Sequence, residues 1–108
     1  MIVVSISTNS DKRECSLRLK GHAGYAEQGK DIVCASASIL ACTLASIVDS
    51  FDDVESVIEL VEGDTTIECQ CKDEQTFIGV KNAYYYTVIG YALLQHHYPQ
   101  YVRLNALT

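Results

Sequence analysis

The sequence predicts an α+β fold, with a single two-layer domain over residues 1–108 and a mainly antiparallel sheet that carries two helices in the order ββαββαβ. Pairs of segments with strand-like alternation are joined by turns, and two longer segments with helical spacing separate these pairs. A hydrophobic content of 48% with a single proline is typical of a folded chain of this length.

The first half of the chain predicts a β-hairpin followed by a helix. Ile2, Val4 and Ile6 alternate with smaller or polar residues, and the same pattern returns at residues 15–19 after a turn at residues 9–12. From Asp31 to about Phe51 the spacing becomes helical. The expected apolar face of this helix consists of Val33, Leu40, Leu44, Ile47 and Phe51, and Ile32 and Ile39 are expected beside it.

The second half predicts another hairpin, a helix and a last strand. Segments 54–61 and 65–71 read as strands joined at Glu62-Gly63-Asp64, and segment 101–107 alternates like a strand. A helix is expected from about residue 73 to 97, because Pro99 ends it. Its expected apolar face is Ile78, Tyr85, Ile89, Ala92 and Leu93.

Charge and cysteine content narrow the classes of partner. Eight basic and fourteen acidic residues give a net charge of −6, which disfavours direct nucleic-acid binding and favours a cationic partner. The sequence predicts neither a signal peptide nor a membrane-spanning run, so we expect a cytoplasmic protein without membrane contact. An odd number of cysteines, five, indicates free thiols.

A histidine and a cysteine flank a glycine-containing loop before the first helix. Asp31 is a suitable N-cap, which places Cys34 at about the third helical position, where the N-terminal N–H groups and the helix dipole favour a thiolate. The same N–H groups, that of Cys34 included, are expected to face an oxyanion, and His22 to transfer protons. A cysteine in such a helix is also commonly a small buried hydrophobe, and the residues alone leave the two interpretations balanced.

Residues 21–26, Gly29, residues 31–35 and Ser38 together resemble the signature of the ribosomal-processing cysteine protease (Prp) family, and the resemblance covers essentially the whole chain. It implies a cysteine endopeptidase without a cofactor, with Cys34 as nucleophile and His22 as general base. A flexible loop over the site is implied at residues 23–30. The resemblance also implies that Gly21, Asp31 and Ser38 support the catalytic residues, and that Gly24 and Gly29 belong to the loop over the site.

The family resemblance also implies a substrate and an assembly. The expected substrate is the N-terminal extension of the twenty-seventh protein of the large ribosomal subunit, a basic protein, cut after an aromatic residue and before a small one. A homodimer is expected. Asp31 has two alternative roles, as a helix N-cap or as a catalytic residue, and the capping role is favoured. Ser36 stands where many relatives have alanine.

Two other interpretations compete with parts of this prediction. A non-catalytic module that binds a ribosomal protein or an assembly factor through the same groove is the alternative function, and an endopeptidase with another peptide substrate is a narrower one. Cys15, Cys69 and Cys71 lack the paired spacing of zinc knuckles, so we expect them to pack in the core and expect no metal site.

Overall fold

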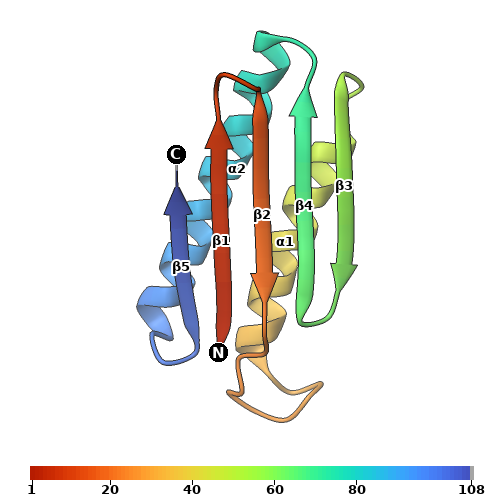
Figure 1. The fold of residues 1–108 in the computed structure, drawn as a ribbon. Coiled ribbons are helices and arrows are strands. Elements are labelled where there is room, and N and C mark those ends of the chain that lie inside the picture. Colours follow the sequence, from red (N-terminus) through yellow and green to blue (C-terminus); the bar gives the residue numbers. More distant parts are fainter. Residues whose placement is uncertain (108) are drawn as a thin grey trace.

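The computed structural model describes residues 1–107 and contains a five-stranded sheet covered on one face by two helices (Figure 1). The sheet order is β3-β4-β2-β1-β5, and only the pairing of β1 with β5 is parallel. This architecture confirms the predicted fold class and element order. The elements are β1 (Ile2–Asn9), β2 (Glu14–Lys20), α1 (Ile32–Asp49), β3 (Val54–Val61), β4 (Asp64–Cys71), α2 (Glu74–His97) and β5 (Val102–Leu107).

The buried face of the sheet follows the predicted alternation. Ile6 pairs with Leu17 across β1 and β2, and Leu17 pairs with Ile67 across β2 and β4, so these side chains form a row beneath the helices. All three are at most 3% exposed. Because side chains alternate along a strand, their neighbours lie on the uncovered face, where Arg18 and Ser5 are exposed.

Helix α1 packs on the sheet through small residues rather than through the expected face. Val33 and Leu44 are buried as predicted, but Ile39 and Ile47 are 64% and 37% exposed, so that part of the prediction is wrong. Because alanine side chains are small, they let the helix lie closer to the sheet than a row of isoleucines would allow. The buried residues of α1 are Val33, Ala37, Ala41, Leu44, Ala45 and Val48.

Helix α2 buries the side opposite to the predicted one. Ile78, Ile89 and Leu93 are 48%, 57% and 56% exposed, so the predicted core face of this helix is wrong. The buried side instead includes Tyr84 and Tyr91, whose hydroxyls donate to the carbonyl oxygens of Ile67 and Ala37, each at 2.8 Å. These hydrogen bonds make the burial of both tyrosines possible. The buried residues of α2 are Phe77, Val80, Ala83, Tyr84, Thr87, Tyr91 and Leu94.

Helix α1 is also more apolar than the sequence analysis predicted. Its 18 residues have a mean hydropathy of 2.0, which is long and apolar enough to cross a membrane by length and composition alone. The expectation that no segment reaches this threshold is therefore wrong. Core helices pass the same test, and here one side of α1 packs against the sheet and α2.

Candidate active site

A cleft of about 640 Å³ opens between the first half of α1 and the ends of β2, β3 and β4. It lies at the end of the molecule where the loop of residues 21–31 connects β2 to α1 (Figure 1). The cleft brings together every residue that the sequence assigned to the site: Gly21, His22, Gly24, Gly29, Asp31, Cys34 and Ser38.

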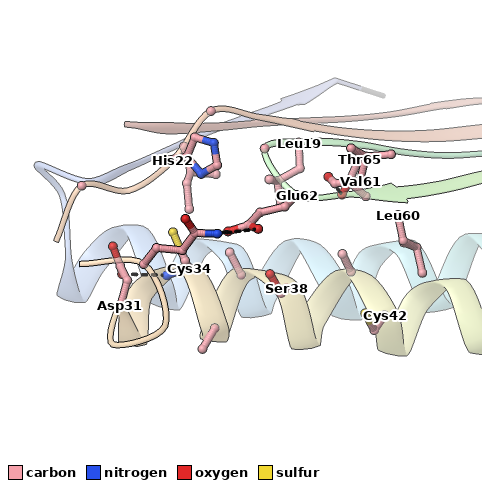
Figure 2. Close-up of a pocket in the computed structure, with 18 of the residues that line it drawn as sticks. Leu19, His22, Asp31, Cys34, Ser38, Cys42, Leu60, Val61, Glu62 and Thr65 are labelled. Carbon is pink, nitrogen blue, oxygen red and sulfur yellow. Dashed lines mark hydrogen bonds between the residues drawn. The ribbon is translucent and has the colours of Figure 1, made fainter. Parts of the chain in front are cut away.

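Cys34 is the third residue of α1, at the position that the capping pattern predicts. Its side chain is half-buried and points into the cleft, and the backbone N–H of Ala23 donates to its Sγ at 3.4 Å. Ser38 and Cys42 follow at successive turns of the same side of the helix (Figure 2). The nucleophile candidate therefore begins a polar row along one wall of the cleft.

Asp31 is the N-cap of α1 and also holds the loop in place. Its Oδ1 accepts from the N–H groups of Val33 and Cys34 at 2.9 and 3.0 Å, and its Oδ2 accepts from Tyr25 and Ala26 at 3.0 and 3.2 Å. Burial opposes ionisation of the carboxyl, but these four N–H donors outweigh it and lower the pKa of Asp31. The predicted capping role is confirmed, and the anchoring of the loop was not foreseen.

One expectation about the oxyanion is wrong for this state of the protein. The N–H of Cys34 was expected to face the tetrahedral intermediate, but it donates to Asp31. Because an N–H group has one hydrogen, it is not free to stabilise an oxyanion at the same time. The N–H of Ala23 is the donor directed at Cys34 Sγ.

His22 lies on the other wall of the cleft, at the end of β2 (Figure 2). Its side chain is exposed, and its carbonyl oxygen accepts from the Met1 nitrogen at 2.6 Å. Within the described residues 1–107, no hydrogen bond joins the imidazole to Cys34. The histidine and the cysteine thus share one cleft, from opposite sides.

The β3–β4 turn supplies residues that the sequence reading did not assign to the site. Glu62 accepts a hydrogen bond from Gln28 Nε2, at 3.2 Å to Oε2, which connects the turn to the loop over the cleft (Figure 2). Gly63 lies beside the His22 ring, and a Cβ at this position would fall 2.7 Å from Nε2. The local sequence marks residues 62–64 only as a turn, and no local signal shows that this turn meets Gln28, 34 residues earlier. Apolar walls come from Leu19, Ala37, Ala41 and Leu60.

Three of the other cysteines lie outside the cleft. Cys15, Cys69 and Cys71 are at most 5% exposed and belong to the core, as expected. Burial raises the pKa of Cys71 to about 11, so its thiol stays protonated at neutral pH. Among residues 1–107, no three His, Cys, Asp or Glu side chains are grouped so that they would hold a metal ion.

The chain matches one protein family and several solved structures. The model of the family described as cysteine protease Prp matches residues 1–103. The chain has no match among the curated proteins. One similar structure is an essential ribosomal processing protease Prp from S. aureus in complex with a covalently linked product peptide, with a TM-score of 0.80 and 22% identity over 98% of this chain and 99% of that one.

Two further structures have the same fold. One is the same S. aureus protease in complex with a substrate peptide, with a TM-score of 0.73 and 21% identity over 98% of this chain and 99% of that one. The other is SMU.848 from Streptococcus mutans, with a TM-score of 0.71 and 25% identity over 100% of this chain and 95% of that one. The family match spans nearly all of the sequence, so the chain belongs to the cysteine protease Prp family.

Proposed function

We propose that this chain is a cysteine endopeptidase that removes the N-terminal extension of the twenty-seventh protein of the large ribosomal subunit. The observation that carries the proposal is the position of Cys34 at the N-terminus of α1, in one cleft with His22, in a member of a cysteine protease family. The similar S. aureus protease is a ribosomal processing enzyme, which supports this class of substrate.

The proposed reaction is acyl transfer through a thioester. His22 takes the proton of the Cys34 thiol, and the thiolate attacks the scissile carbonyl carbon. Collapse of the tetrahedral intermediate breaks the C–N bond, and protonated His22 gives its proton to the leaving amine. Water then hydrolyses the thioester, which releases the new carboxylate and restores the thiol. The Ala23 N–H, which donates to Sγ, supports the thiolate form of Cys34 before the attack.

The cleft supports binding of an extended peptide with an aromatic side chain. The apolar residues that line the cleft include Leu19, Ala41 and Leu60, which suits a large apolar residue before the scissile bond. The loop over the cleft is connected to the β3–β4 turn through Gln28 and Glu62, an arrangement suited to covering a bound peptide. The net charge of −6 is complementary to a basic ribosomal protein.

A homodimer formed through α2 is part of the proposal. The helix buries one side in the core and exposes a second apolar side, made by Ile78, Tyr85, Ile89 and Leu93. This exposed stripe runs for about 22 Å along the helix, since a helix rises about 1.5 Å per residue. A continuous apolar surface of this kind is typical of a subunit interface.

The test is mass spectrometry of a synthetic peptide with the sequence of the host's N-terminal extension after incubation with the protein. The wild type is expected to cut one bond, and Cys34→Ala to bind the peptide without cutting it. Cys42→Ala removes the other thiol of the cleft and is the matched control. It should still cut the same bond, because it keeps the nucleophile at the helix N-terminus.

Each other outcome contradicts a different part of the proposal. If wild type and Cys34→Ala bind the peptide and neither cuts it, the chain is a binding module rather than a protease. If the wild type cuts other peptides but not this one, the chemistry holds and the substrate is wrong. If Cys34→Ala still cuts, the nucleophile is elsewhere.

A further inference from the structure

The β3–β4 turn forms a wall directly against the imidazole of His22. A methyl group placed on Gly63 would lie 2.7 Å from Nε2 of His22 and 2.9 Å from Cε1. Both distances are shorter than the contact of two non-bonded heavy atoms, about 3.5 Å at the optimum. The ring therefore occupies space that is open only because residue 63 has no side chain.

The turn is fixed to the backbone beside His22, so the wall has a defined position. The N–H of Gly21 donates to the carbonyl oxygen of Gly63 at 2.9 Å. Lys20 pairs with Asp64 in the β2–β4 register, and their side chains form an ion pair of 3.6 Å. The residues before His22 and after Gly63 are thus joined by backbone pairing and by charge.

The conformation of Gly63 adds a second requirement for glycine. Its φ is +78°, in the left-handed region that residues with a Cβ rarely adopt. Gly29 shares this feature with a φ of +87°, but a methyl group on Gly29 would meet nothing within 4 Å. Comparing alanine substitutions at the two glycines therefore separates the effect of backbone strain from the effect of contact with His22.

We propose that Gly63 is a positioning residue for His22, and that the β3–β4 turn sets the orientation of the general base toward Cys34. The inference rests on the proposed function, in which His22 transfers protons. Gly63 leaves room for the ring and takes no part in the chemistry. A side chain at this position is expected to push the imidazole away from the place that it occupies in the structure, while the apolar walls that hold the peptide stay in place.

The test compares four proteins: wild type, Gly63→Ala, His22→Ala and the double variant. Gly63→Ala is expected to lower kcat by about 10- to 100-fold with little change in KM, because a displacement near 1 Å costs rates of this order. In the His22→Ala background the added methyl group meets no ring, so Gly63→Ala should lower the residual rate no further. The imidazole NMR signals of His22 should shift in Gly63→Ala.

Gly29→Ala is the control for folding, because it adds the same strain without a neighbour. Gly63→Ala and Gly29→Ala are expected to lower Tm by similar amounts. Should Gly63→Ala fail to fold, Gly63→Asn replaces it, since asparagine tolerates the left-handed region and still carries a Cβ. In the wild type, a nuclear Overhauser effect between the Gly63 α-hydrogens and the His22 ring tests the contact without any substitution.

The outcomes separate this inference from the proposed function. If His22→Ala keeps the wild-type kcat, His22 is not the base and the proposed function fails at that residue. If His22→Ala lowers kcat but Gly63→Ala does not, the positioning role is overturned. It is also overturned if Gly63→Ala lowers kcat by the same factor in the wild type and in His22→Ala. Absence of the nuclear Overhauser effect also overturns it.

Discussion

At the scale of residues, Asp31 connects three parts of the site through one carboxylate. It caps α1, holds the N–H of Cys34 and fixes the loop at Tyr25 and Ala26. Sequence analysis found the cap because Asp before a helical pattern is a local signal. It did not find the loop contacts, because the loop's turn back onto Asp31 is not encoded in any periodic pattern.

Asp31→Asn is expected to destabilise the protein by about 1–2 kcal/mol near neutral pH, because asparagine can keep the cap through its one oxygen but leaves the N–H groups of Tyr25 and Ala26 without an acceptor. The amide NH₂ would face N–H donors where the wild type has a carboxylate oxygen. Urea unfolding measures the difference.

The pH dependence of that loss follows from the pKa of Asp31. The pKa is lowered in the folded protein, so the carboxylate contributes stability above its unfolded value of 3.8, and this contribution is lost as pH falls through the folded pKa. The difference between wild type and Asp31→Asn should therefore shrink in acid. Asp73→Asn, at the N-cap of α2, is the matched control. That carboxylate is exposed and accepts from the N–H of Thr76 without holding a loop, so its replacement should destabilise the protein less.

At the scale of elements, α1 serves both the core and the cleft because its two sides differ in size and polarity. Alanines face the sheet, and Cys34, Ser38 and Cys42 face the cleft. Helical periodicity predicted the length and start of α1 but favoured its large apolar residues as the core. In the structure the side with small residues faces the core instead. Small side chains let the helix pack close to the sheet, and the isoleucines lie on the exposed side.

Ser38→Leu is expected to fill the cleft one turn after Cys34 and to raise KM for the peptide by about tenfold, as steric exclusion from a pocket costs one or two kcal/mol. The rate of Cys34 alkylation by iodoacetamide should change little, because the thiol stays accessible to a small reagent. Ser46→Leu, exposed on the same helix and outside the cleft, is the matched control. An unchanged KM for Ser38→Leu would show that the peptide does not run along α1.

At the scale of the whole molecule, α2 has more apolar surface than one core can bury. Its predicted core face, from Ile78 to Leu93, is the exposed one, and the buried side relies on tyrosines whose hydroxyls reach backbone oxygens. An amphipathic pattern tells which residues share a side but not which apolar side faces the sheet. Here the sheet determines that choice.

Ile89→Asp is expected to convert the proposed dimer to a monomer, because a charge in an apolar interface loses its hydration without a partner. Multi-angle light scattering after size-exclusion chromatography measures the mass. Ser5→Asp places the same charge on the uncovered face of the sheet and should leave the mass unchanged. A wild type that elutes as a monomer at all concentrations would contradict the dimer.

The sequence by itself determined the features that depend on near neighbours: the order ββαββαβ, the turns, the cap at Asp31 and the positions of His22 and Cys34. Alternation, helical spacing and capping are local, so a single chain reveals them. Only the tertiary structure decided which side of α2 is buried, which N–H faces the thiol, and that Gly63 meets His22. These depend on contacts between distant segments, which the packing of the helices on the sheet fixes.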